Sequence, residues 1–287
     1  MRKISVSIVF IYVFITLLTL FCMLPLVLVL ITSFASERSI TLNGYTFFPT
    51  EWSIDAYKLM FNPNSNVLTS YMITIIVTLI GSVISVLITY CAGYALANKR
   101  CKYRNGLALF FFITMVFNTG LVPWYMISRN LGLYNNIWAL IIPSLVFSPF
   151  NMFLTRNFIR GIPDSLHESG IVDGAGEMLI AFKIYFPLCM PVLATITLYY
   201  GINYWNNYFN AVMLIDDPKK YPLQMLLFAI QSEITKASRV SAGVHVNPPK
   251  ESFKMAVSII TIGPIILFYP ALQKYFIKGM IIGAVKG

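Results

Sequence analysis

The chain has 287 residues, of which 57% are hydrophobic and only 11% are charged. A soluble domain carries about 25% charged residues, so the composition excludes an ordinary soluble protein and predicts a polytopic membrane protein. The net charge of +10 does not indicate nucleic-acid binding. The basic residues lie mostly at the ends of apolar runs, as membrane topology requires, and not among aromatic residues on a soluble domain.

Six uncharged apolar runs approach the length of about 20 residues that a transmembrane helix needs. The first run is far longer than the roughly 7–15 apolar residues of a signal peptide. Its length favours an uncleaved span, although Ser33-Phe34-Ala35 resembles a cleavage site. The six predicted spans lie within residues 4–36, 59–98, 105–128, 130–155, 184–215 and 255–273.

These spans predict an N-terminal transmembrane helix (1–36), an extracellular loop (37–66) and a core of five further spans (67–287). The core includes loops at 163–187 and 216–254. With the N-terminus inside, the inner segments hold twelve of the 21 Lys and Arg residues. Six of the nine outer ones lie in the long loop 216–254, which such counts weigh least. We therefore expect both termini in the cytoplasm.

The two outer loops are long enough to suggest a function. The second of them contains a candidate helix at 223–236. The second predicted span has a small residue at every fourth position, which places them in one stripe on the helix. Such a stripe predicts close helix packing, either within the chain or with a partner subunit. The stripe consists of Gly81, Ser85, Thr89, Gly93 and Ala97.

The loop at 163–187 has the pattern of two short helices joined by a turn. Ser165 and Glu168 have the spacing of a capping box, with Ser165 as the N-cap residue. Asp173-Gly174 predicts a tight turn in which glycine takes a positive φ. Pro187 would then open or bend the entry to the fifth span. From the residues alone, an ordinary amphipathic linker remains an equal alternative.

The same stretch resembles the EAA loop of binding-protein-dependent ABC importers. That motif is Glu-Ala-Ala, three residues, Gly, nine residues and Ile-x-Leu-Pro. Residues 205–224 and 269–287 are in addition similar to MalG-like sugar permeases. The departures from the motif should loosen the first short helix slightly but keep the turn. The matching positions are Glu168, Gly174, Ile184 and Pro187, and the departures are Ser169, Gly170 and Phe186.

The resemblance implies an all-α membrane protein with the six-helix fold of a type I ABC importer permease. The loop at 163–187 would be a cytoplasmic coupling helix that moves with an ATPase, and Gly174 would provide a tight turn that a side chain would block. The tail at 278–287 would approach the ATPase interface. The expected ATPase-coupling residues are Glu168, Ser169, Gly170, Asp173, Gly174, Ile184 and Pro187.

The resemblance also implies the partners. They are a second homologous permease, two ATPase subunits, an extracellular solute-binding lipoprotein that contacts loop 216–254, and the lipids of a bacterial cell membrane. The chain itself is expected to be no enzyme and to bind no cofactor, because it has no G-x-x-x-x-G-K-[ST] motif. ATP and Mg²⁺ would be bound by the ATPase. The transported solute would be a carbohydrate, with an oligosaccharide favoured.

A cluster of amides and aromatic rings near the end of the fifth span is a candidate sugar path. The 19 residues from Pro187 to Asn206 span about 28 Å in a helix, which places the cluster near the outer membrane face. An interfacial aromatic belt and packing between the permeases are the alternative. Asn118 and Asn151 are weaker candidates. The cluster consists of Asn203, Tyr204, Trp205, Asn206, Asn207, Tyr208 and Asn210.

Three other functions were weighed. A secondary transporter would need a charge at mid-membrane or an inverted repeat, and neither is visible. The lack of charge in the spans also favours a neutral or weakly charged solute. The chain lacks the motifs of an intramembrane enzyme, because neither HExxH nor G-x-S-x-G occurs. An ABC permease for a peptide or phosphate shares the EAA loop and remains open. The four cysteines and two histidines are scattered, so neither a metal site nor a disulfide is predicted.

Overall fold

The computed structural model of the chain describes residues 6–62, 66–117, 119–143, 145–240 and 251–264. Within these ranges the regular structure is helical, and the only extended pairing is an isolated bridge between Ala35 and Trp52. The predicted all-α fold is therefore confirmed. The chain divides into two compact units, of which the first contains residues 6–68 and 227–264 and the second contains residues 69–226.

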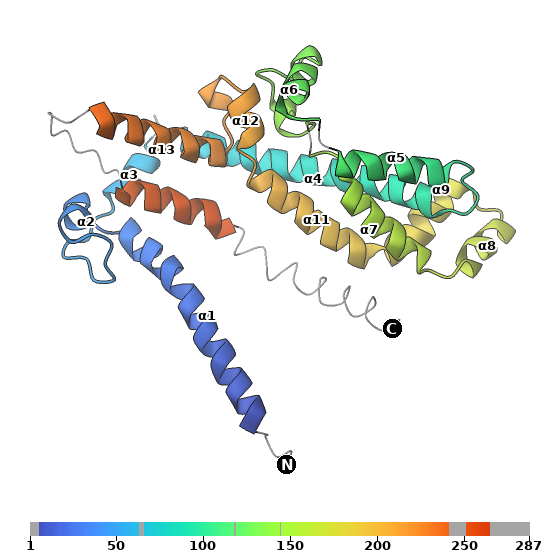
Figure 1. Cartoon of the computed structure of the whole chain (residues 1–287), viewed down its shortest axis with the longest axis horizontal. Coiled ribbons are helices and arrows are strands. Elements are labelled where there is room, and N and C mark those ends of the chain that lie inside the picture. The colour runs from blue at the N-terminus through green and yellow to red at the C-terminus, as the bar shows by residue number, and fades with distance from the viewer. Residues whose placement is uncertain (1–5, 63–65, 118, 144, 241–250, 265–287) are drawn as a thin grey trace. The chain divides into compact units, whose positions relative to one another are not determined.

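The first unit begins with α1 (Val6–Ser33), a helix of 28 residues (Figure 1). An apolar window of 18 residues within this helix has no buried residue, as is expected of a helix that faces lipid. After α1 the chain enters α2 (Glu37–Asn43), where Ser36 Oγ accepts a hydrogen bond of 3.0 Å from Ser39 N. The first predicted span is confirmed as one uninterrupted helix.

The predicted outer loop 37–66 is ordered against the start of the helix at 251–264. The carboxylate of Glu37 accepts hydrogen bonds from the backbone N–H groups of Glu251 (3.1 Å) and Ser252 (3.2 Å). It thereby satisfies donors that a helix start leaves unpaired. Tyr45 donates a 2.7 Å hydrogen bond to Glu251, and this bond raises the pKa of Tyr45 to about 12. The loop also contains α3 (Asp55–Met60).

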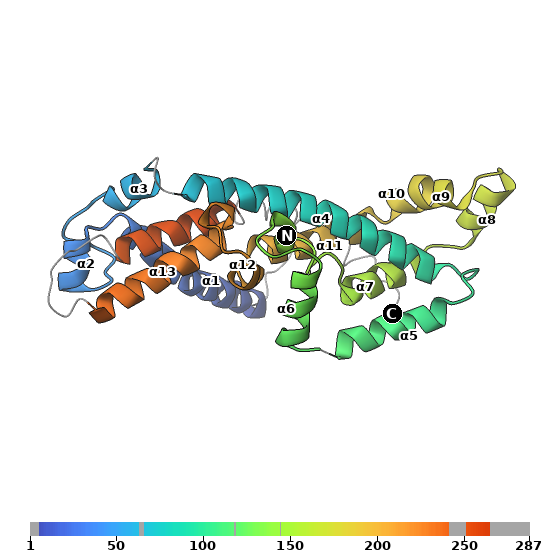
Figure 2. The same ribbon diagram turned by 90° about the horizontal axis from the view of Figure 1, so that it is seen from above.

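The second unit is organised around α4 (Val67–Ala97), α7 (Pro149–Arg160) and α11 (Met190–Trp205). In both views α11 runs beside α4 (Figures 1 and 2). Two further helices, α5 (Arg104–Val116) and α6 (Leu121–Asn130), meet at an angle of 115°. The third predicted span is therefore a broken pair of helices rather than one straight helix.

The prediction of a fourth helical span at 130–155 is wrong. Only a short 3₁₀ turn, η1 (Ile137–Leu140), precedes α7, which starts at Pro149. Pro143 and Pro149 have no backbone N–H to donate to a continuing helix, and Ser148 Oγ instead caps α7 by accepting from Asn151 N at 3.4 Å. An uncharged apolar run thus does not guarantee a helix.

The number of spans can be compared with the described helices by length and composition. Two of these helices, Val9–Ser33 and Val67–Ala97, are long and apolar enough to cross a membrane alone, and two bent pairs would raise the number to four. The predicted sixth span at 255–273 begins as the helix at 251–264, and the rest of it lies outside the described residues, as does the tail at 278–287. Six spans therefore stay a prediction.

The remaining elements of the second unit follow α11. They are α12 (Phe209–Leu214), the 3₁₀ turn η3 (Pro218–Lys220) and the start of α13 (Leu223–Val240). The last of these confirms the helix that the sequence predicts at 223–236. A side chain of α4 fixes the helix start, because Leu223 N donates a 2.8 Å hydrogen bond to Thr74 Oγ1.

The small-residue stripe of α4 packs within the chain. Ser85 Oγ lies 2.9 Å from the hydroxyl of Tyr204, and Thr89 Oγ1 lies 2.6 Å from the hydroxyl of Tyr200, so two tyrosines of α11 are anchored on the stripe. A Cβ atom on Gly81 would lie 2.6 Å from the ring of Tyr204. The predicted close packing is confirmed, and the partners of the stripe are α11 and, at Gly93, α7 of the same chain.

Gly81→Ala is therefore expected to destabilise the second unit by about 1–3 kcal/mol, because the buried Tyr204 ring has to move. The matched control is Gly106→Ala on α5, where a Cβ would meet no atom within 4 Å. Thermal unfolding of the purified variants in detergent measures both effects. The control should unfold at or slightly above the temperature of the parent chain. Equal unfolding temperatures for both variants would contradict the packing described.

Candidate functional site

The loop at 163–187 forms a projecting helix–turn–helix, and its first helix is α8 (Ser165–Val172). Both views place α8 beyond the end of α4 (Figures 1 and 2). The predicted capping box is wrong, because the N-cap residue is Asp164 and no side chain caps the helix. Asp164 already has helical φ and ψ angles of −62° and −23°, and its carboxylate pairs with Lys99. Ser165 therefore lies inside the helix.

The turn after α8 is closed by two backbone hydrogen bonds around a glycine. Gly174 has a φ of +76°, as predicted. Ala175 N donates to Gly170 O at 2.9 Å, and Gly174 N donates to Ile171 O at 2.9 Å. This is the Schellman arrangement of a helix end. A Cβ on Gly174 would meet no atom within 4 Å, so the backbone angle demands glycine here. The expectation that a side chain would block this turn therefore rests on the backbone angle and not on a lack of space.

Gly170, one of the departures from the EAA motif, is buried where α8 rests on the second helix of the loop. A Cβ there would lie 3.1 Å from side-chain atoms of both Ile180 and Ile184. Real Cβ atoms are rarely in contacts this tight, so glycine permits the close approach of the two helices. The same contact gives Ile184 a packing role in the loop.

The second helix of the loop is continuous from Glu177 to Leu188 and then bends by 81° into α11. Its parts are α9 (Glu177–Leu179), the π-helical segment η2 (Ile180–Tyr185) and α10 (Phe186–Leu188). The predicted bend at Pro187 is displaced to Cys189. Pro187 lies in the first turn of α10, where proline is tolerated. Pro191 likewise lies in the first turn of α11, which begins after the bend.

Glu177 connects the loop to the end of α4. His167 Nε2 lies 3.2 Å from Glu177 Oε1, the Tyr94 hydroxyl donates to Oε2 at 3.1 Å, and Asn98 Nδ2 donates to the same oxygen at 3.4 Å. Burial alone would raise the pKa of Glu177, but the hydrogen bonds from His167 and Tyr94 hold that pKa below its usual value. Local sequence patterns do not predict this cluster, because its members are up to 83 residues apart.

Glu177→Ala is expected to loosen α8 and to raise its amide hydrogen exchange several-fold at pH 7. A carboxyl whose pKa is lowered on folding stabilises the folded state above its unfolded pKa of about 4.3 and loses that contribution as the pH falls through the lowered value. The parent chain should therefore keep a protected α8 at neutral pH. Glu168→Gln is the control, because its exposed side chain lies outside the cluster. Unchanged exchange in Glu177→Ala would show that the cluster does not hold α8.

The outer side of the loop exposes apolar side chains. Val172 is 85% exposed and Met178 is 72% exposed. They flank the turn at Gly174, beside the exposed carboxylates of Glu168 and Asp173. Apolar side chains that project from a rigid turn are typical of a contact surface for another protein. Ser169 and Pro187, the two remaining predicted coupling residues, are also exposed.

The predicted sugar-path cluster is divided by the structure into buried and exposed residues. Tyr204 and Trp205 are buried, and the Tyr204 hydroxyl donates to Ile141 O at 3.2 Å. The amide of Asn210 is buried and donates to the carbonyl oxygens of Ala139 at 3.2 Å and Pro143 at 2.9 Å.

The other members of the cluster are more accessible. Asn203, Asn206 and Tyr208 are exposed, and Asn207 is half-buried. Their contact with a sugar stays a prediction. Of the two weaker candidates, Asn151 is buried in α7 and Asn118 lies outside the described residues.

The described residues hold no group of three or more His, Cys, Asp or Glu side chains that could bind a metal ion. All four cysteines are free, and Cys189 is buried at the bend before α11.

Comparison with known proteins shows the family of the chain. Residues 91–282 match the family described as "Binding-protein-dependent transport system inner membrane component". The polygalacturonan/rhamnogalacturonan transport system permease protein YtcP of Bacillus subtilis (strain 168) is 35% identical over 279 residues, covering 96% of this chain and 97% of that protein. Protein LplC of the same organism is 37% identical over 266 residues, covering 92% of this chain and 89% of LplC.

A solved structure is similar over nearly the same length. It is the crystal structure of a bacterial ABC transporter involved in the import of the acidic polysaccharide alginate. One of its chains has a TM-score of 0.82 and 31% sequence identity, covering 96% of this chain and 100% of that chain. The family match spans well over half of the sequence, and both curated relatives match along almost all of it. The chain therefore belongs to the family of inner membrane components of binding-protein-dependent transport systems.

Proposed function

We propose that the chain is a permease subunit of an ATP-driven importer and forms half of the translocation path for an oligosaccharide. The loop at 163–187 is the coupling element that an ATPase subunit moves. The observation that carries this proposal is the glycine-capped helix–turn–helix with exposed Val172 and Met178, in a chain of this transport family. ATP and Mg²⁺ are bound by the ATPase, and the chain needs no cofactor of its own.

A carbohydrate solute is supported by the relatives. YtcP is named as a permease of polygalacturonan/rhamnogalacturonan transport, and the similar solved structure is of a transporter involved in the import of alginate. The arabinooligosaccharides transport system permease protein AraQ of Halalkalibacterium halodurans is a further relative, at 28% identity over 267 residues. The exposed amides of Asn203 and Asn206 offer hydrogen-bond donors and acceptors for sugar hydroxyls.

The proposal includes the partners and the orientation. A second, homologous permease completes the path, two ATPase subunits bind below it, and a solute-binding lipoprotein delivers the sugar from outside. Both termini and the loop at 163–187 lie in the cytoplasm, and the loops at 37–66 and 216–254 lie outside. Transport follows alternating access, in which nucleotide and the loaded binding protein bias the same two-state pore from opposite sides.

Reconstitution of the complete importer in liposomes tests this function. Labelled oligogalacturonides and neutral arabino-oligosaccharides are supplied separately with the cognate binding protein, and accumulation is measured with and without internal ATP. ATP-dependent accumulation of either class is the expected result. Accumulation of a phosphate or peptide substrate, with no accumulation of any oligosaccharide, would contradict the carbohydrate assignment.

A further inference from the structure

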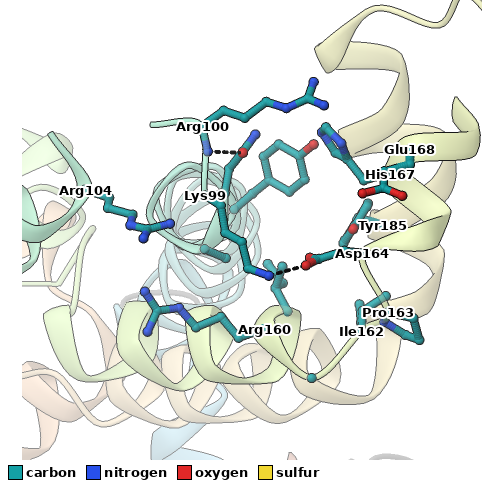
Figure 3. Close-up of a pocket in the computed structure, with 15 residues that line it drawn as sticks. Lys99, Arg100, Arg104, Arg160, Ile162, Pro163, Asp164, His167, Glu168 and Tyr185 are labelled. Carbon is teal, nitrogen blue, oxygen red and sulfur yellow. Dashed lines mark hydrogen bonds and ion pairs between the residues drawn. The ribbon is translucent and has the colours of Figure 1, made fainter. Parts of the chain in front are cut away.

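A cavity of about 800 Å³ lies at the loop end of α4. It is lined by the end of α4, the start of α5, the end of α7 and the start of α8 (Figure 3). Figure 3 shows two unlike sides. His167 and Glu168 of α8 form one side, and Arg104 and Arg160 extend on the other, away from them.

The charges in this cavity are only partly compensated. Lys99 pairs with Asp164, whereas no ion pair joins Arg100, Arg104 or Arg160 to a carboxylate among the described residues. Each guanidinium offers five N–H donors in a planar fork that suits phosphate oxygens. The described part of the chain therefore supplies no anion to balance the positive charge on the arginine side of the cavity.

The position of Arg104 and Arg160 indicates where that anion comes from. The 31 residues of α4 span about 46 Å, which exceeds a hydrocarbon core of about 30 Å. The charged residues Lys99 and Arg100, which follow α4, place this end of the helix at the membrane surface. Arg104 is the first residue of α5, and none of the residues of α5 is buried. Leu107 and Phe110 of α5 are 44% and 58% exposed, so an apolar surface begins one turn after Arg104.

Arg160 lies at the same level, because it ends α7, which packs against α5. A phosphate held between two arginines, beside an exposed apolar helix, is the arrangement that an anionic lipid requires: a headgroup site and a surface for its acyl chains. Neither a soluble anion nor an acidic protein surface would use the apolar face of α5.

We propose that Arg104 and Arg160 bind the headgroup phosphate of an anionic phospholipid whose acyl chains lie along α5. Arg100, at the mouth of the same cavity, contributes a further positive charge. The bound lipid would link the membrane surface to the base of α8, next to the Lys99–Asp164 pair.

Native mass spectrometry of the full chain in a nonionic detergent tests this proposal. Phosphatidylglycerol is titrated as the anionic lipid and phosphatidylcholine as the zwitterionic one. The parent chain should retain phosphatidylglycerol at least fivefold better. Arg104→Gln combined with Arg160→Gln should abolish that preference, and Arg104→Lys with Arg160→Lys should restore part of it. The matched control is Lys102→Gln with Lys183→Gln, which removes the same charge from exposed residues outside the cavity.

Several outcomes would overturn the proposal. One is an equal preference in the arginine variant and the parent chain, and another is an equal loss in both double glutamine variants. Complete displacement of phosphatidylglycerol by millimolar inorganic phosphate would identify a site for a free anion instead. If the arginine variant loses the ATPase from the complete importer but retains lipid normally, the arginines serve the ATPase. Unfolding temperatures within a few degrees of the parent value verify that the variants are folded.

Discussion

Gly174→Val is expected to stop sugar uptake while the importer continues to hydrolyse ATP. Gly174 has a φ of +76°, which a β-branched residue avoids at a cost of at least about 1–2 kcal/mol. The two hydrogen bonds that close the turn would then open, and α8 would no longer hold a fixed angle to the helix that starts at Glu177. The loop would then bend when the ATPase moves, and the motion would not be transmitted to the transmembrane helices. Uptake and ATPase activity of the reconstituted importer measure the effect, and we expect uptake to fall at least tenfold.

The matched control for this variant is Gly176→Ala. Gly176 is two residues away, has an ordinary φ of −71°, and has no atom within 4 Å of its missing Cβ. Alanine there should preserve uptake and coupling. Normal uptake by Gly174→Val at normal abundance in the membrane would refute the coupling role of this turn. Equal losses in both variants would show that any change in the loop is harmful, and not specifically the loss of the left-handed glycine.

Asn210→Leu is expected to lower the stability of the chain, whereas Asn203→Ala is expected to affect sugar uptake alone. The buried Asn210 amide donates to two carbonyl oxygens, of Ala139 and Pro143. Leucine would leave both oxygens buried without these donors, which costs about 2–4 kcal/mol and should lower the abundance of the folded chain. Asn203 is exposed, so alanine there should leave the folded chain intact. If Asn203 lies on the sugar path, its replacement should raise the sugar concentration needed for half-maximal uptake.

Membrane abundance, unfolding temperature and the concentration dependence of uptake distinguish these results. Asn206→Ala is a second test of the exposed side of the cluster, since the Asn206 side chain accepts an exposed 3.2 Å hydrogen bond from Gln224. Unchanged uptake in both alanine variants would remove the cluster from the sugar path. Normal stability of Asn210→Leu would contradict the buried hydrogen bonds.

Features with a local cause could be predicted from the sequence. The long apolar helix α1, the turn at Asp173-Gly174 and the end of α8 at Val172 depend on residues that are neighbours in the chain. The stripe on α4 predicted close packing because its periodicity is a property of one helix. The sequence could not name the partner of that stripe, since Tyr204 follows Ser85 by 119 residues.

Features that depend on distant residues or on the exact backbone geometry were missed or misplaced. The capping box at Ser165 was wrong because Asp164 already has helical angles and its carboxylate pairs with Lys99. The bend before α11 lies at Cys189, between two helical segments whose first turns contain Pro187 and Pro191. The fourth apolar run is not one helix. Hydropathy reports where a segment can lie, and not whether its backbone is regular.

The candidate site shows the same division. The EAA-like spacing located the loop and its glycine turn. The Glu177 cluster joins α8 and α9 to α4, and it can be recognised only in the folded structure. The cluster at residues 203–210 combined two environments that composition cannot separate, because asparagine and tyrosine serve both in buried hydrogen bonds and on exposed surfaces.

Photo-crosslinking from the tip of α8 would show whether this loop contacts an ATPase subunit. A photoreactive amino acid replaces Val172, which is 85% exposed, and a second variant carries it at Phe48, which is 89% exposed in the predicted outer loop. Membranes of the bacterium that produces the chain are irradiated, and the adducts are identified by mass spectrometry. We expect an adduct between position 172 and an ATPase subunit, and no ATPase adduct from position 48. An adduct of position 48 with the ATPase, or no ATPase adduct from position 172, would contradict this expectation.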